Sequence, residues 1–218
     1  MTPRCAKVLM PEGGVYTMRI DAPESAEELA GRTAVVLLDY GVDAGLVLEP
    51  AAPPSGTPPG FAVLRLPTAK DAETLRENEA EAEAFAADLE KGAASSIPGF
   101  KLFSARLSLA KRKIFVRFAA SPQRVGPERL ARALGRRCPY CIDARQLGAR
   151  DQAAESRAMG ECGRVCCRAL LGKSRRGPQR APGCGPLIAK SSPRAFGTCG
   201  CVKCCLEFEN TPIEGSAQ

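Results

Sequence analysis

The chain has 218 residues, a formal net charge of +7 and 11 cysteines, but no histidine. Its length suits one large domain or two small ones. The absence of histidine excludes every Cys/His zinc pattern. It also removes the commonest general base and the usual activator of a catalytic cysteine, so a thiol hydrolase is disfavoured.

The charge is unevenly distributed along the chain. Residues 101–218 contain 23 Lys and Arg against 8 Asp and Glu, whereas residues 1–100 contain 8 against 16. A basic second half predicts an anionic partner, which is usually nucleic acid. A solubilising arginine-rich surface is the alternative, because the arginines are dispersed rather than grouped in one run.

The N-terminal sequence and the hydropathy favour a cytoplasmic protein without a membrane span. The first residues, MTPRCAKVLMPEGG, lack the apolar run of a signal peptide. No stretch approaches the roughly 20 apolar residues that cross a bilayer. In a reducing cytosol, clustered thiols are more often metal ligands or redox groups than disulfides.

Five short apolar runs in the first 67 residues predict strands. Gly- and Pro-rich turns separate them, which is typical of a small β-barrel or a curled sheet. We therefore expect an N-terminal β-rich unit over residues 1–67. The predicted strands are residues 7–10, 15–20, 33–39, 45–49 and 61–66.

A long helix is predicted next, over residues 68–98, as a link between two structural units. Thr68 and Asp71 form a capping pair at its start, and Gly92 fits a C-terminal stop. Its apolar residues fall on one helical stripe, which predicts packing by one face. The stripe consists of Leu75, Ala82, Phe85 and Leu89.

Residues 99–218 predict a C-terminal mixed α+β domain. Residues 101–121 predict a β-hairpin with a basic turn at 111–113, in which Phe103, Ala105 and Leu107 alternate with polar residues. Pro127 suits the first position of a helix, and residues 142–148 predict a third strand. The expected fold class is therefore α+β, with a barrel-like unit, a linking helix and a domain that carries Cys-rich metal-binding loops.

Ten of the cysteines lie in the second half of the chain. Two of their clusters share one form, Cys-Gly followed by a short spacer and Cys-Cys, and such an internal repeat is more specific than a lone C-x-x-C. The clusters are Cys138-Pro-Tyr-Cys141, Cys162-Gly-Arg-Val-Cys166-Cys167 and Cys199-Gly-Cys201-Val-Lys-Cys204-Cys205, with Cys184 alone between the last two.

The repeated form suits a thiolate-bound metal or an iron–sulfur cluster, which needs about four converging sulfurs. Glycine beside a ligand lets the backbone turn tightly, and nearby cations favour the thiolate. Zinc is an alternative, bound by Cys138 and Cys141 with Cys201 and Cys204. The C-x-x-C as a thiol-redox pair is another, and Cys5 and Cys184 also fit simple buried side chains.

The strings ARQLGARDQAA (144–154), GECGRVCC (160–167) and PRAFGTCGCVKCCLEFE (193–209) resemble the bacterial stage 0 sporulation protein YaaT family, also called RicT, of the polymerase-suppressor C-terminal domain proteins. The resemblance extends to the helix ENEAEAEAFAADLE and to the strands VVLLDYGVDAGLVLE, and so covers nearly the whole chain. The paired Cys-Gly motifs and the Arg-Gln-Leu-Gly-x-Arg-Asp string are its specific parts.

The resemblance implies a cytoplasmic, non-catalytic adaptor. Such a protein assembles with two small helical partners, RicA and RicF, into a complex that carries 4Fe–4S clusters. The complex supports mRNA processing by ribonuclease Y, and sporulation and competence in some bacteria. Carried over by position, the implied ligands are Cys162, Cys166, Cys167, Cys199, Cys204 and Cys205.

The chain departs from the family pattern at several positions. The first motif is one residue short between Gly163 and Cys166, and Cys201 stands where the family has Arg. The residues after Cys167 also differ from the family's usual stretch. Extra thiols add secondary candidate metal ligands, which either complete a cluster within this chain or form a separate zinc site. These are Cys138, Cys141, Cys184 and Cys201.

Overall fold

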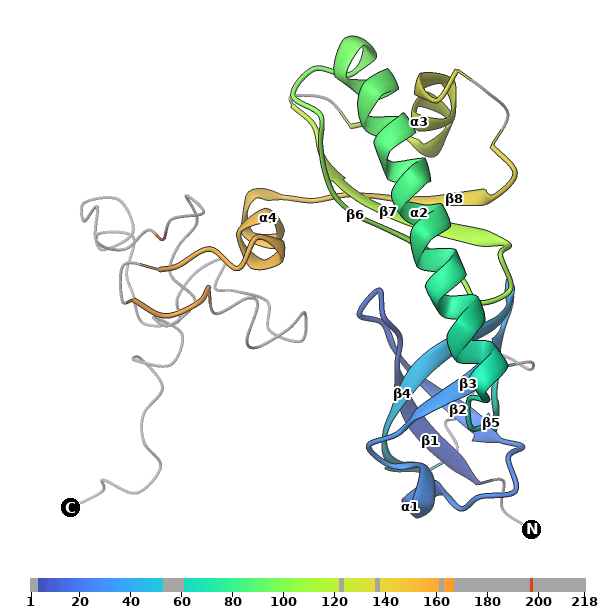
Figure 1. Cartoon of the computed structure of the whole chain (residues 1–218). Coiled ribbons are helices and arrows are strands. Elements are labelled where there is room, and N and C mark those ends of the chain that lie inside the picture. Colours follow the sequence, from blue (N-terminus) through green and yellow to red (C-terminus); the bar gives the residue numbers. More distant parts are fainter. Residues whose placement is uncertain are drawn as a thin grey trace, which may run out of the picture. The chain divides into compact units, whose positions relative to one another are not determined.

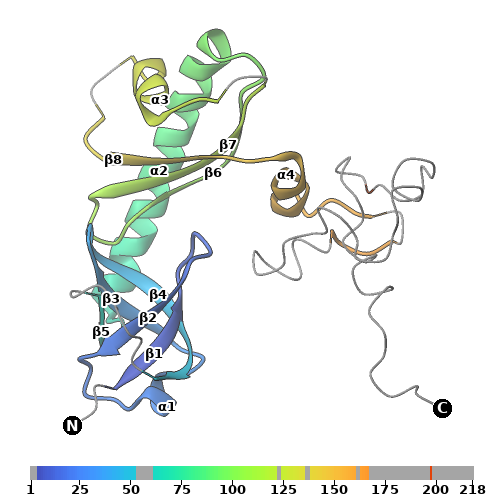
Figure 2. The same ribbon diagram turned by 180° about the vertical axis from the view of Figure 1, so that it is seen from behind.

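The computed structural model of the chain describes residues 4–52, 61–121, 124–135, 138–160, 163–166 and 197. The chain divides into two compact units, Met1–Gln146 and Leu147–Gln218. Figures 1 and 2 show the elements from opposite sides, and the fold is mixed α+β as expected. None of the helices in this described part is long and apolar enough to cross a lipid bilayer.

The first five strands form a closed barrel, which confirms the predicted N-terminal β-barrel. The strand order is β1-β2-β5-β3-β4, and pairing of β1 with β4 closes the barrel. Aliphatic side chains and methionines fill its interior, where Val8, Met18 and Val36 are fully buried. The strands are β1 (Cys5–Leu9), β2 (Val15–Ile20), β3 (Thr33–Leu38), β4 (Gly41–Ala51) and β5 (Ala62–Arg65).

Hydrophobic periodicity does not reveal the four-residue helix α1 (Ala26–Leu29), which lies between β2 and β3. Its signal is a capping box. The Glu28 N–H donates to Ser25 Oγ at 3.2 Å, and the Ser25 N–H donates to Glu28 Oε2 at 2.7 Å. Leu29 of this helix is buried in the barrel core, so α1 packs its apolar side against the interior of the barrel.

The long helix α2 (Ala69–Ser96) begins at the predicted position. The Asp71 N–H donates to Thr68 Oγ1 at 3.3 Å, and the Thr68 N–H donates to the Asp71 carboxylate at 2.7 Å. Arg65 adds a second bond to this carboxylate at 2.9 Å. Hydrogen bonds from Arg65 and Thr68 hold the pKa of Asp71 well below its usual range, so the charged carboxylate stabilises the first turn.

The predicted end of this helix at Gly92 is wrong. The helix runs on to Ser96, and the Ile97 N–H still donates to the Ala93 carbonyl at 2.8 Å. Ile97 itself is extended, with φ −128° and ψ 108°. Pro98 explains this end, because a residue before proline is driven out of the helical conformation.

Gly92 marks the place where α2 touches the helix α3 (Pro127–Ala133). A β-carbon placed on Gly92 would lie 1.7 Å from the carbonyl oxygen of Ala133. Any side chain at this position therefore collides with backbone rather than with a flexible side chain. The glycine is required for close helix packing and not for ending the helix.

We expect Gly92→Ala to destabilise the protein by about 1–3 kcal/mol, the usual range for overpacking a tight contact. Alanine gains about 1 kcal/mol of helix propensity over glycine, but the added methyl group has to push α3 away. Urea unfolding followed by circular dichroism measures the change. Lys91→Ala, at the exposed neighbouring position, is the matched control. A Gly92→Ala protein at least as stable as the wild type contradicts the close contact.

The rest of the first unit is a three-stranded sheet with the order β6-β7-β8. β6 (Lys101–Leu107) and β7 (Lys113–Ala119) form the predicted hairpin, and β8 (Cys141–Gln146) lies parallel to β7. The crossover from β7 to β8 contains α3, which begins at Pro127 as predicted. Side chains of α2, α3 and the three strands share one core, so both helices cover the same face of the sheet (Figure 1).

A register shift in β6 changes which side chains face the helices. Strict alternation puts Phe103 beside Ala105 and Leu107, but the pairing with β7 shifts between Leu102 and Ser104. Leu102 and Leu107 pack into the core under α2. Phe103 instead lies on the opposite face, where Lys101 Nζ is 5.1 Å from its ring centre. Alternation alone therefore does not give the face of Phe103, because a bulge reverses the direction of one side chain.

A buried ion pair joins the barrel to this sheet. Asp43 of β4 is fully buried, and its carboxylate accepts from the Arg106 guanidinium of β6 at 2.8 and 3.0 Å. The Leu109 N–H and the Tyr40 hydroxyl also donate to it, at 3.2 and 3.1 Å. Burial and the negative charge of Asp43 raise the pKa of Tyr40 well above its usual value. The carboxylate is thus satisfied on both oxygens, and Glu12 adds a second anion 3.1 Å from Arg106.

Candidate functional site

In the second unit, helix α4 (Ala149–Glu155) leads directly into the first Cys-Gly motif. Arg157 adopts a left-handed φ of +48°, and its N–H donates to the Ala154 carbonyl at 3.1 Å. The Ala158 N–H donates to the Ala153 carbonyl at 2.9 Å. This Schellman pattern ends the helix and reverses the chain. It therefore sets the direction in which the chain leaves α4 at residue 158.

Residues 158–160 and 163–166 are the two described sides of a tight hairpin, called the hairpin of residues 158–166 below, and a bridge between Met159 and Val165 closes it. The Gly160 N–H donates to the Arg164 carbonyl at 2.8 Å, and the Gly163 N–H donates to the Gly160 carbonyl at 3.0 Å. Gly163 has φ +72°, a conformation that side chains disfavour. The glycine of the first motif is therefore explained by the turn at the hairpin tip.

Cys166 lies at the base of this hairpin. Its N–H donates to the Ala158 carbonyl at 2.8 Å, and its thiol is half-buried. Cys162, the residue before Gly163 in the sequence, lies outside the described residues. A tight glycine turn with a thiol at its base suits a metal-binding loop, because glycine lets the backbone come close to a bound group.

Of the six primary candidate ligands, only Cys166 belongs to the described residues. Two of the four secondary candidates, Cys138 and Cys141, are also described. The spatial relation of the two matched motifs therefore stays a prediction. The candidates outside the described residues are Cys162, Cys167, Cys184, Cys199, Cys201, Cys204 and Cys205.

The two thiols of the C-x-x-C lie on different sides of the β6-β7-β8 sheet. Cys138 packs against the core under α2 and is half-buried. Cys141 is exposed at the start of β8, directly opposite Lys113 of β7, on the face away from the helices. One metal ion needs its ligands on one side, so this placement does not bring the pair together as a chelating knuckle.

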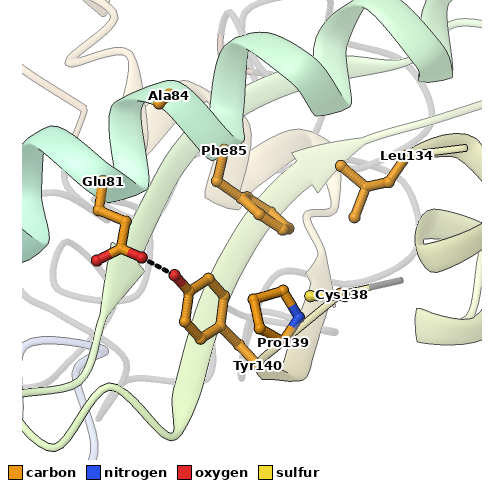
Figure 3. A pocket seen from close by; sticks show the side chains of 7 residues that line it. All are labelled: Glu81, Ala84, Phe85, Leu134, Cys138, Pro139 and Tyr140. Carbon is orange, nitrogen blue, oxygen red and sulfur yellow. Dashed lines mark hydrogen bonds between the residues drawn. The ribbon is translucent and has the colours of Figure 1, made fainter. Parts of the chain in front are cut away.

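Cys138 lines a small cavity of about 140 Å³ between α2, the end of α3 and the segment before β8 (Figure 3). Phe85 and Leu134 form its apolar wall. The Tyr140 and Phe85 rings meet edge-on, with their centres 6.4 Å apart. The Tyr140 hydroxyl donates to Glu81 of α2. Hydrogen bonds from Tyr140 and Lys111 lower the pKa of Glu81, so this carboxylate is charged and anchors the C-x-x-C segment on the helix.

The sequence does not single out the Asp43–Arg106 pair or the Glu81–Tyr140 contact. The sequence does contain a signal for the Asp43–Arg106 pair, because Asp43 is the one acidic residue in the apolar stretch 41–48. Its partner Arg106 lies 63 positions away, and no local pattern links the two. Both contacts join elements of the first unit.

The four described cysteines are free thiols, and Cys5 is buried in the barrel, as a packing residue would be. Within the part of the chain that the structure describes, no three Cys, Asp or Glu side chains converge as a metal ion would require. The structural basis for the candidate site is thus the hairpin of residues 158–166 alone. No family model, no curated protein and no solved structure matches the chain.

Proposed function

We propose that the chain is a non-catalytic, iron–sulfur-binding regulatory adaptor that acts on RNA metabolism. The observation that carries this proposal is the hairpin of residues 158–166, which places Cys166 at the base of a tight glycine turn. The sequence repeats the same Cys-Gly and Cys-Cys form at residues 199–205. Two such loops supply more than the four thiolates that one cluster needs.

The donor set is chemically suited to a 4Fe–4S cluster. It contains thiols and no imidazole, and Arg164 and Lys203 within the two motifs favour deprotonated sulfur. When bound, such a cluster supplies a redox-sensitive connection between the two loops. The residues that would hold it are Cys162, Cys166, Cys167, Cys199, Cys204 and Cys205.

The adaptor role follows from the resemblance to the YaaT/RicT proteins and from the basic second half. By this resemblance the chain acts in the cytoplasm with RicA- and RicF-like helical proteins and with ribonuclease Y. It would thereby influence mRNA processing and sporulation-type development. The charge of +15 in residues 101–218 supports an approach to RNA or to an RNA-bound enzyme.

Metal analysis of the protein purified without oxygen tests the proposal. We expect iron and acid-labile sulfide in nearly equal amounts, with little zinc, because a 4Fe–4S cluster contains both elements in equal number. A colourless protein that contains zinc and no sulfide contradicts the proposal. It would favour instead a zinc-stabilised nucleic-acid-binding module.

A further inference from the structure

Strand β8 forms one edge of the sheet in the first unit. In the order β6-β7-β8 it pairs with β7 on one side (Figure 2). Among the described residues, no strand pairs with its other side. A strand edge of this kind presents backbone N–H and C=O groups, with which a strand of another molecule can pair.

The register with β7 identifies the backbone groups of β8 that lie at this edge. The Cys141 N–H donates to the Arg112 carbonyl at 3.0 Å, so Cys141 and every second residue after it bond to β7. The residues between them, Ile142, Ala144 and Gln146, direct their N–H and C=O groups outward. No backbone group of the described residues bonds to Ile142 or Ala144 on that side. These two residues therefore offer donors and acceptors to a further strand.

The side chains of β8 on the face away from the helices carry opposite charges. Asp143 and Arg145 lie on this face, because Ile142 and Ala144 pack into the core on the other one. Both charged side chains are also engaged within the chain, Asp143 with Lys113 Nζ at 3.0 Å. Charges of one sign protect an edge strand from pairing. Since the signs alternate in β8, the effect of these charges depends on the register of the incoming strand.

An antiparallel copy of β8 suits both the backbone and the charges in one register. In such a pair, outward residues of one strand have to face outward residues of the other. With Ala144 opposite Ala144 of the copy, Ile142 is opposite Gln146, and each Asp143 is opposite an Arg145. A shift by one step in either direction places Asp143 opposite Asp143 or Arg145 opposite Arg145, and such like charges repel. The strand is therefore self-complementary in the register centred on Ala144.

We propose that the protein forms a two-fold symmetric dimer in which the two β8 strands pair antiparallel about Ala144. One continuous sheet with the order β6-β7-β8-β8-β7-β6 then crosses the two-fold axis. The contact uses the same surface on both copies, so it closes and does not propagate into a fibre. Pairing of one short strand is small for a protein interface, and we therefore expect weak, micromolar association. The inference uses neither the cysteine motifs nor RNA, so it is independent of the proposed function.

Sedimentation equilibrium of the full-length, anaerobically purified protein over a concentration series tests the dimer. Ala144→Pro removes the N–H at the centre of the pairing but none of the bonds to β7, because this N–H points outward. We expect the variant to stay monomeric at concentrations at which the wild type dimerises. Ala144→Ser retains the N–H and is the matched control. Circular dichroism confirms that each variant is folded.

The register is tested by reversing its charges. Arg145→Asp places carboxylates opposite each other at two symmetric positions, and we expect the dissociation constant of the dimer to rise at least about tenfold. D143R/R145D restores opposite charges in the same register and should recover most of the affinity. Arg76→Asp makes the same charge change at an exposed position of α2 and should leave the dimer unchanged.

Three outcomes overturn the inference. In the first, the wild type stays monomeric at every concentration, which leaves the edge to a strand of another protein. In the second, Ala144→Pro dimerises as well as Ala144→Ser. In the third, D143R/R145D dimerises no better than Arg145→Asp. Iron and sulfide are measured on the same preparations, so a zinc protein without sulfide whose dimer depends on Ala144 overturns the iron–sulfur proposal alone.

Discussion

Replacing Cys199, Cys204 and Cys205 together by alanine is expected to remove most of the iron and sulfide from the protein. These residues lie outside the described part of the chain, and they are half of the six primary candidate ligands. A 4Fe–4S cluster needs four thiolates, and only three of the primary candidates remain in this variant. Iron and sulfide per chain, with the visible absorption of the anaerobic protein, measure the loss.

Two control variants separate this ligand set from the remaining thiols. Cys5→Ala changes a buried thiol of the barrel and should leave the iron content unchanged. C138A/C141A removes two thiols that face different sides of the sheet, and it should also retain iron. If C138A/C141A loses the metal and the triple variant keeps it, the primary ligands are wrongly assigned. The metal would then be held by a set that contains the C-x-x-C, and the placement of its two thiols on opposite faces would be contradicted as well.

The sequence predicts the barrel, the long helix and the β-hairpin because their signals are local. Alternating apolar residues identify the strands, and the Thr68–Asp71 pair fixes the start of α2. Pro127 does the same for α3. Each signal depends on neighbours within one or two turns of chain, so no knowledge of the tertiary structure is needed.

Gly92 and Phe103 show why other features escape such prediction. The role of Gly92 depends on the Ala133 carbonyl, which is 41 positions away and approaches only after α3 has packed. The facing of Phe103 depends on the register shift between β6 and β7. A bulge does not alter the local hydrophobic pattern, and so the alternation predicts the wrong face.

Some features of the candidate metal site are likewise predictable from the sequence, and others depend on the tertiary structure. Count and spacing identify the thiol clusters and their repeated form, and the hairpin explains why glycine follows Cys162. Spacing alone makes Cys138 and Cys141 equivalent members of one pair. The start of the parallel strand β8 places them on opposite faces, and this depends on its pairing with β7.

The buried ion pair between barrel and sheet predicts the second large effect. Asp43→Asn is expected to lower the free energy of unfolding by about 3 kcal/mol, the lower end of the range for breaking a buried pair. The amide keeps the size of the carboxylate but leaves the Arg106 guanidinium without its main counter-charge. We expect the lower end of this range because the Arg106 side chain is 28 % exposed and the Glu12 carboxylate still lies 3.1 Å from its guanidinium group.

Asp21→Asn is the matched control, because Asp21 pairs with Arg19 on the barrel surface, where water screens both charges. Urea unfolding should show a much smaller loss for this variant, and equal losses for the two substitutions contradict a special role of the junction. Combining Asp43→Asn with Arg106→Met is expected to recover part of the stability, since the uncompensated cation is then removed. Recovery identifies the buried charge, rather than a missing hydrogen bond, as the cause. It also means that the barrel and the sheet are held together by electrostatic pairing that apolar packing can replace.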